Sequence, residues 1–439
     1  MPRTERPLLP LLLAMTLALV ALPRAAAALT PLQIEAGAGS APAGTRETTT
    51  QLASDAFQGR NNLTEGSQLA QAYLIPLLRA IGPGVGGGSD DDAYKHSFAA
   101  GTNLIAVIRG RELPDEYVMV GAHYDHLGVA KNGDVFNGAT DNAAGVAVAI
   151  AVGQAIRALP EAPRRSVVIA LWDAEEDGLL GSIAYVGDPP LPLDKTVACV
   201  NLDIQGSDLT PGLARTSIAV GAETGGPLLA EVVTAAVADE ARSYPRGVDT
   251  VQLSYIFGQL RSDYASFVAA EVPTVFFSDS TSACYHTVKD ESRFVDFDKL
   301  ASQSRITFRV TAELAEGSSV PEFVAPNPGL ATYTDAVTLA KIFARATPDE
   351  NRFTTQDRRR IQQIVADVAA VVARGPESFG SADAGTLLSA AANTLDVLDA
   401  GLECAGYFGR TSPFRIAGDH QQDGRRTITG ATRPLLPTR

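Results

Sequence analysis

The chain has 439 residues, of which 45% are hydrophobic and 20% are charged, and its net charge is −14 at pH 7. These fractions are those of an ordinary globular enzyme. The acidic balance argues against nucleic acid and against anionic membrane surfaces as partners, because there is no basic patch to meet phosphate groups. The length suffices for one large domain with an addition.

The chain opens with the pattern of an export signal peptide at residues 1–28. Two early arginines form a basic start, residues 8–22 are almost wholly apolar, and four alanines at 25–28 offer a cleavage site. The alternative is an uncleaved anchor, but the apolar run is short for a membrane span of about 20 residues. We expect a periplasmic or secreted mature protein that keeps no stable membrane anchor after cleavage.

The segment after the signal combines a loose part and a helical part. Residues 29–50 are rich in Ala, Gly and Thr, and this composition predicts a loose leader. Apolar residues then recur at helical spacing from Thr48 to Ile81, which predicts a helix. The acidic, glycine-rich run at 85–92 predicts a solvated surface loop.

Apolar strand-like runs then alternate with helical patterns as far as residue 314. Strands are predicted at 103–109, 116–122, 166–172, 197–202, 218–220 and 274–277, and helices at 145–159, 180–186, 227–241, 262–270 and 298–314. This alternation predicts a mostly parallel sheet with helices on both faces. In such sheets the functional loops lie beyond the carboxyl ends of the strands.

The remaining chain differs in composition from the region before it. Residues 316–329 contain several prolines and glycines and predict a linker after a domain that spans 29–315. Residues 330–439 carry three helical patterns, at 335–346, 355–373 and 383–405, and predict a helical C-terminal extension. The sequence does not indicate a role for this extension.

Three cysteines occur in the chain: Cys199, Cys284 and Cys404. An exported protein can pair two of them, and the sequence leaves all the pairings open. Cys199 lies within an apolar run, so we expect it to be a small buried side chain.

Five short motifs of acidic residues and histidines follow one another in the predicted α/β region. They are His123-Tyr124-Asp125, Asp141-Asn142, Glu175-Glu176, Asn201-Leu202-Asp203 and Tyr285-His286. Four of the five lie after predicted strands, where distant parts of the chain converge. Together they supply two imidazoles, three carboxylate ligands and a spare carboxylate, which is the set that two zinc ions need to activate water.

Each motif also has a simpler explanation when it is taken alone. The simpler roles are a core histidine at 123, a helix cap at 141, an exposed acidic pair at 175–176, a turn cap at 203 and a surface histidine at 286. Two adjacent carboxylates repel each other, so burying both after an apolar strand requires a strong positive charge nearby. One of them can bind metal while the other stays free as a general base.

The first motif places several polar side chains close together. On an extended segment residues two apart face the same side, so Asp125 can hold the second ring nitrogen of His123. On the same reasoning His126 faces away, and we expect it not to be a ligand.

The charge of the predicted centre can be balanced. Asp141 lies between small residues that allow close approach of the backbone, and its two oxygens can bridge two metals. Asp141, Glu176 and Asp203 carry three negative charges against the four positive charges of two zinc ions. A bridging hydroxide brings this cluster to neutrality.

The ordered segments GAHYDHLG, GATDNAAG, LWDAEEDGLLGS, NLDIQG and YHTVKDE resemble those of exported zinc aminopeptidases of the bacterial leucyl aminopeptidase type. Glutamate carboxypeptidase and glutaminyl cyclase are more distant relatives. The resemblance covers about residues 50–315. It implies a three-layer α/β/α sandwich with a mixed, mostly parallel sheet, two Zn²⁺ ions per chain, and peptide or protein N-termini as substrate.

The resemblance also implies a role for each matching residue. The implied metal ligands are Asp141 as a bridge, His123 and Asp203 at one zinc site, and Glu176 and His286 at the other. Glu175 is implied as the general base and Asp125 as the partner that orients His123. A cis peptide bond after the bridging aspartate is common in the family.

The chain departs from the family at Tyr264, where many relatives have a histidine, and residues 316–439 have no counterpart in the resemblance. We expect an exported zinc-dependent exopeptidase that acts as an aminopeptidase. The alternatives are a carboxypeptidase-like or glutaminyl-cyclase-like enzyme on the same fold, and a non-catalytic exported binding protein with a vestigial metal site. The sequence indicates neither the side-chain specificity nor the oligomeric state.

Overall fold

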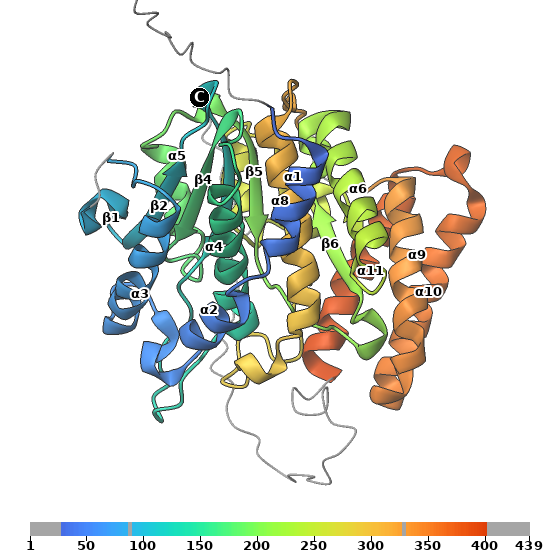
Figure 1. Cartoon of the computed structure of the whole chain (residues 1–439). Helices are drawn as coiled ribbons and strands as arrows, with labels where there is room; N and C mark the ends of the chain where they lie inside the picture. Colours follow the sequence, from blue (N-terminus) through green and yellow to red (C-terminus); the bar gives the residue numbers. More distant parts are fainter. Residues whose placement is uncertain (1–27, 87–89, 327–330, 402–439) are drawn as a thin grey trace, which may run out of the picture. The chain divides into compact units, whose positions relative to one another are not determined.

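A computed structural model describes residues 28–86, 90–326 and 331–401 (Figure 1). The expected signal peptide up to residue 27, and the chain beyond residue 401, lie outside these ranges. The described strands are β1 (Lys95–Phe98), β2 (Gly101–Ile108), β3 (Leu113–His123), β4 (Arg165–Trp172), β5 (Thr196–Leu202), β6 (Thr216–Val220), β7 (Asp249–Leu253) and β8 (Thr274–Ser278).

Helices precede, separate and follow these strands. Those before β8 are α1 (Pro31–Ser40), α2 (Thr45–Leu52), α3 (Glu65–Ile81), α4 (Ala144–Arg157), α5 (Leu180–Gly187), α6 (Gly226–Ser243) and α7 (Tyr264–Ala269). Those after it are α8 (Phe297–Glu316), α9 (Tyr333–Ala346), α10 (Thr355–Arg374) and α11 (Ser381–Gly401).

The strands form one mixed sheet in the order β1-β2-β4-β3-β5-β8-β6-β7. The central neighbours β4, β3, β5 and β8 run parallel, and so do β6 and β7. Antiparallel pairing joins β1 to β2, β2 to β4 and β6 to β8. The expected mixed, mostly parallel sheet is therefore confirmed, and β1 and β7, which the sequence pattern did not predict, are short strands at its two edges.

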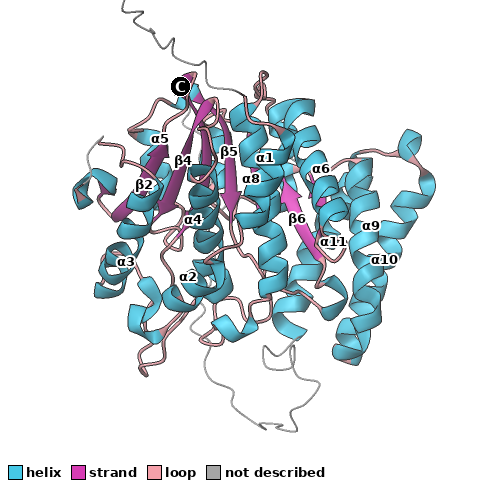
Figure 2. Cartoon of the chain, in the orientation of Figure 1, coloured by secondary structure: helices cyan, strands magenta, loops and turns pink. Residues whose placement is uncertain are grey.

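The central strands are buried on both faces. In β3, Val118 and Val120 join a large apolar cluster with α4 and α8, whereas Tyr117 and Met119 join a second cluster with Trp172 on the other face. Successive side chains of a strand point to opposite faces, so a strand covered on both sides is apolar at every position. Figure 2 shows α4, α8 and α1 in front of the strands.

The N-terminal segment is helical, and the expectation of a loose leader at 29–50 is wrong. Helix α1 begins with a capping box in which Thr30 and Gln33 each bond the other's backbone N–H. It has no broad apolar face. Instead it lies against α8 through Gly37, where an added Cβ would stand 2.3 Å from the ring of Phe308. Glycine at this contact replaces the large side chains that a sequence pattern would detect.

The helix expected from Thr48 to Ile81 is interrupted. Helix α2 ends at Leu52, a short 3₁₀ turn covers Asp55–Arg60, and α3 begins at Glu65. Arg60 at the end of this turn has a positive φ of 52°. The break brings Arg60 into the interior, where its side chain is fully buried.

One helical stretch, Ala139–Arg157, is long and apolar enough to cross a membrane by length and composition. Its most apolar window is 94% buried inside the fold. It contains α4, which packs on the central strands, so its apolar character serves the core.

The helices predicted for the C-terminal extension are present as far as Gly401 and lie together beside the sheet (Figure 1). An apolar cluster joins Leu339 and Phe343 of α9 to Val251 and Leu253 of β7. Lys341 and Arg345 of α9 also form ion pairs with a single aspartate at the start of β7.

The cysteines differ in state. Cys199 is a free thiol buried in the second apolar cluster, as expected, and burial raises its pKa. Cys284 is disulfide-bonded. Cys404 lies outside the described residues.

A buried ion cluster connects α6 to α8. The side chain of Glu240 has no exposed surface, and its two oxygens lie 2.6 Å from Arg305 Nη2 and 2.7 Å from Arg309 Nη1. Both arginines are themselves nearly buried. Removing the carboxylate would leave Arg305 without its acidic partner, and would leave Arg309 with only the half-exposed Glu35 at 2.9 Å.

We therefore predict that Glu240→Ala lowers the free energy of unfolding by about 3–5 kcal/mol, as measured by urea denaturation. Glu231→Ala, on the exposed side of the same helix, is the matched control and should change it by less than about 0.5 kcal/mol. Equal losses for the two variants would contradict the role assigned to the cluster.

Candidate metal centre

The five motifs meet at the carboxyl ends of the central parallel strands. Strand β3 ends at His123, β4 comes shortly before Glu175, and β5 comes directly before Asp203. Asp141 lies in an irregular turn before α4, and His286 lies in the loop after β8. The placement expected from the strand pattern is thus what the structure shows.

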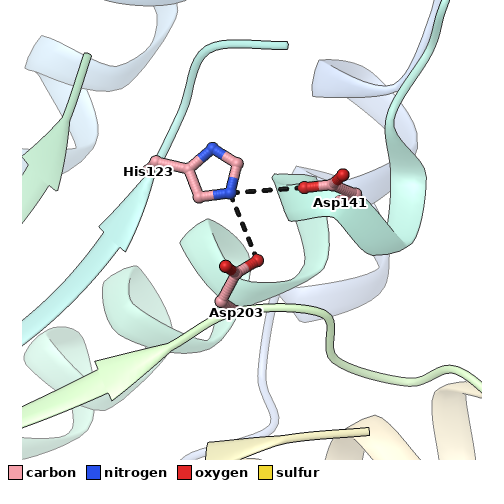
Figure 3. A group of neighbouring side chains, drawn as sticks. All are labelled: His123, Asp141 and Asp203. Carbon is pink, nitrogen blue, oxygen red and sulfur yellow. Dashed lines mark hydrogen bonds and ion pairs between the residues drawn. The ribbon is translucent and has the colours of Figure 1, made fainter. Parts of the chain in front are cut away.

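A first group surrounds the Nε2 atom of His123. This nitrogen lies 3.3 Å from Asp141 Oδ1 and 3.2 Å from Asp203 Oδ1 (Figure 3). All three side chains are buried. On the far side of the ring, His123 Nδ1 lies 3.5 Å from Asp125 Oδ1, so Asp125 stands where a partner of that ring nitrogen was expected.

A second group surrounds the Nε2 atom of His286. This nitrogen lies 3.2 Å from Asp141 Oδ2 and 2.9 Å from Glu176 Oε2. Asp141 therefore presents one oxygen to each histidine. The spare carboxylate of Glu175 lies beside the first group, with its Oε2 atom 4.0 Å from His123 Nε2.

His126 does not face away from the cluster, which corrects the orientation expected from strand alternation. Its side chain is fully buried, and its Nδ1 atom lies 2.7 Å from Glu176 Oε1. Strand β3 ends at His123, so the alternation of an extended segment does not continue to position 126. The loop instead turns His126 towards the second group.

Asp290, four residues after His286, holds the turn that carries Asp141. Its carboxylate accepts hydrogen bonds from the backbone N–H groups of Thr140 at 3.0 Å and Asp141 at 3.1 Å, and from the Thr140 hydroxyl at 2.9 Å. The peptide bond between Asp141 and Asn142 is cis, as the resemblance implied.

The buried guanidinium of Arg60 joins the loops on either side of the centre. It donates to the carbonyl oxygens of Tyr124 at 2.8 Å, Asn137 at 2.8 Å and Gly138 at 3.0 Å. Burial lowers its pKa to about 10, and the charge of nearby Asp125 opposes this shift. The sequence pattern gave this residue no role, because most of its partners are carbonyl groups far along the chain.

Asp125 has a second contact beyond His123. Its two oxygens accept hydrogen bonds from the backbone N–H groups of Glu175 at 3.1 Å and Glu176 at 3.2 Å. One carboxylate thus fixes the turn that carries the adjacent glutamates and also stands beside a ring nitrogen of His123.

The donor set fits a pair of zinc ions. Asp141 Oδ2 and His286 Nε2 are buried and lie 3.2 Å apart, but among the described residues neither atom has a partner in hydrogen-bond geometry. Burial lowers the pKa of His286, but its contacts with Asp141 and Glu176 outweigh burial and raise the value to about 10, so this site attracts a cation. Two ligands of one tetrahedral zinc stand about 3.4 Å apart. The separations of 3.2–3.3 Å from the two Asp141 oxygens to the histidines are close to that value.

Glu175 has the surroundings of a proton acceptor. Burial raises the pKa of its carboxyl well above the usual value, and the charge of Asp203 adds to this rise. A general base works best when its pKa lies near the working pH, so a raised value favours this role.

Tyr264, which departs from the family pattern, belongs to the core. Its ring stacks on Phe276 with centroids 4.8 Å apart, and its hydroxyl accepts a hydrogen bond from Leu260 N–H at 2.9 Å. Only 1% of its surface is exposed. It therefore shapes the loop before α7 from inside.

Two neighbouring groups of side chains that could hold metal ions, at the strand ends of an α/β/α fold, are an arrangement typical of metal-dependent hydrolases. Residues 103–311 match the model of peptidase family M28. The family match covers all five motifs.

Individual relatives agree with this assignment. The chain is 29% identical over 263 residues to "Probable glutamate carboxypeptidase LAMP1" of Arabidopsis thaliana, an overlap of 55% of this chain and 36% of that protein. It is 34% identical over 108 residues to "Aminopeptidase NAALADL1" of Mus musculus, which covers 24% of this chain and 13% of that protein. The chain thus spans well under half the length of these two relatives.

A solved structure shares the fold. The aminopeptidase LapA of Legionella pneumophila superposes with a TM-score of 0.53 at 18% identity, over 67% of this chain and 77% of that one. At this identity the likeness concerns the fold alone.

We predict that Asp290→Asn weakens zinc binding by about 10–100-fold, because the amide has one acceptor oxygen and cannot hold both backbone N–H groups of the Asp141 turn. Zinc titration by calorimetry measures this loss. Asp115→Asn, exposed near the opposite end of β3, is the control. Wild-type zinc affinity in a folded Asp290→Asn protein would show that the turn does not depend on Asp290.

Proposed function

We propose that this protein is an exported zinc-dependent exopeptidase that removes N-terminal residues from peptides or proteins, with two Zn²⁺ ions per chain. The observation that carries the proposal is the position of Asp141, whose Oδ1 lies 3.3 Å from His123 and whose Oδ2 lies 3.2 Å from His286. One carboxylate that faces two separate imidazoles is suited to bridging two metal ions.

The remaining ligands divide between the two positions. Asp203 joins His123 at the first, and Glu176 joins His286 at the second. Zinc bound there would lower the pKa of a water molecule to about 7 and polarise the scissile carbonyl group. Asp125 holds His123 in orientation and acts through it.

Glu175 is the proposed general base. Its side chain is buried beside the first group and its pKa is raised, so it can accept a proton from the attacking water. The same carboxylic acid then gives that proton to the amine that leaves when the peptide bond breaks. The acidic surroundings also favour a substrate that presents a free α-ammonium group.

Export is part of the proposal. The first 28 residues have the signal-peptide pattern, and Cys284 is disulfide-bonded. Disulfides persist in the periplasm and outside the cell, and they are rare in the cytosol.

A second candidate activity, carboxypeptidase-like cleavage, is favoured by the position of Arg261. This exposed arginine donates from Nη2 to the Tyr285 hydroxyl at 3.4 Å, and the Tyr285 ring stacks on His286. A guanidinium beside the second group can bind a carboxylate with two parallel hydrogen bonds. A peptide C-terminus supplies such a carboxylate.

We predict that Glu175→Gln abolishes hydrolysis of aminoacyl chromogenic substrates while two zinc ions remain bound, because the amide cannot accept the proton and is not a proposed ligand. Activity and metal content should be measured on the same sample. Glu313→Gln, exposed on α8, is the control. A rate near that of the wild type would overturn the assignment of Glu175.

Arg261→Gln separates the two candidate activities. If the enzyme recognises a C-terminal carboxylate, the variant raises KM about tenfold or more for N-blocked peptides with a free C-terminus. If it is an aminopeptidase, KM for aminoacyl chromogenic substrates changes little, and N-blocked peptides are not cleaved by either protein. Arg246→Gln, at another exposed position, controls for the loss of surface charge.

A further inference from the structure

His126 lies against the second metal position and carries a role that the five motifs do not assign. Its ring has no exposed surface, and its Nδ1 atom lies 2.7 Å from Glu176 Oε1. An ionised carboxylate can only accept, so this nitrogen is the donor when Glu176 is ionised. The same nitrogen lies 3.8 Å from Asp141 Oδ2. His126, Asp141 and Glu176 therefore form a group that is close enough to be taken for three ligands of one metal.

The distances favour a different arrangement. Two ligands on a common tetrahedral zinc stand about 3.4 Å apart. The His126–Glu176 separation of 2.7 Å is much shorter than this and is the length of a charge-assisted hydrogen bond, and the separation from Asp141 is 3.8 Å. His286 lies nearer the expected value from both of its carboxylate neighbours, at 3.2 Å and 2.9 Å.

We propose that His126 is a positioning residue that sets the orientation of the metal ligand Glu176. Its Nδ1–H holds Oε1, and this turns Oε2 towards His286 at the second metal position. Carboxylates that bind metal commonly need such an outer hydrogen bond, which fixes the ligand before the metal arrives. The inference rests on the proposed function, because it assumes that Glu176 binds zinc.

The loop after β3 holds His126 firmly enough for this role. The ring lies on Gly138, where an added Cβ would stand 2.5 Å from its Cγ atom, so no side chain fits between them. Arg60 fixes the carbonyl of that same glycine and the carbonyl of Tyr124. Asp125, which belongs to this loop, accepts a hydrogen bond from the backbone N–H of Glu176. One loop therefore fixes both the backbone and the side chain of the ligand.

The arrangement predicts an effect on one metal position only. Glu176 belongs to the second position. His126→Leu should therefore lower the affinity for the second zinc ion by about 10–100-fold and leave the affinity for the first zinc ion within about twofold of the wild-type value. His126→Asn should recover most of the loss, because the asparagine amide can place an N–H donor near the site of imidazole Nδ1. His96→Leu is the matched control, since this histidine lies in the edge strand β1.

The experiment is a stepwise zinc titration of the full chain by calorimetry, with X-ray absorption to count imidazoles per metal and thermal unfolding to show that each variant folds. The expected result is a weakened second step in His126→Leu, recovery in His126→Asn, and an unchanged imidazole count at saturating zinc in both. A lower imidazole count in His126→Asn would make His126 a ligand and overturn the proposal. Equal weakening of both steps, or unchanged affinity, would also overturn it. Binding of fewer than two zinc ions by the wild-type chain would instead contradict the proposed function. The wild-type titration gives this result before any variant is compared.

Discussion

Repulsion between carboxylates is the constraint on which the rest of the site depends. Side chains of five acidic residues are buried together at the ends of three neighbouring strands: Asp125, Asp141, Glu175, Glu176 and Asp203. Burying like charges is costly unless cations and N–H donors face them. Three histidines, His123, His126 and His286, face the carboxylates within the centre. Asp125 also accepts hydrogen bonds from the backbone N–H groups of Glu175 and Glu176. The space between the histidines and carboxylates then suits metal ions, which carry more charge than protons do.

The sheet makes this concentration of charge possible. Strands β4, β3 and β5 are parallel neighbours, so their carboxyl ends meet at the same edge and bring residues from distant parts of the chain together. Apolar clusters cover both faces of these strands and hold them rigidly. Hydrogen bonds to two carboxylates then fix the turns that carry the acidic side chains. Asp290 accepts from the backbone of the Asp141 turn, and Asp125 accepts from the backbone N–H groups of the two adjacent glutamates.

Local patterns were enough to predict much of this structure. The long apolar strands and amphipathic helices are visible in the sequence, and the motifs at their ends lie together as expected. The features that the sequence did not predict depend on contacts between residues that are distant in the chain. Helix α1 packs through Gly37 rather than through an apolar stripe, the buried position of Arg60 depends on carbonyl groups 64 and 78 residues away, and His126 turns inward because β3 has already ended. None of these leaves a periodic signal.

The packing of α9 on β7 has a consequence for the state of the chain in solution. Strand β7 is the last in the sheet, and such an edge has backbone N–H and C=O groups that can pair with another molecule. Two residues of this strand, Val251 and Leu253, pack in an apolar cluster with Leu339 and Phe343 of α9. A chain that ended before α9 would expose this apolar surface next to an open strand, a combination that promotes aggregation. The C-terminal helices therefore cover apolar residues at this edge of the sheet, whatever further role they have.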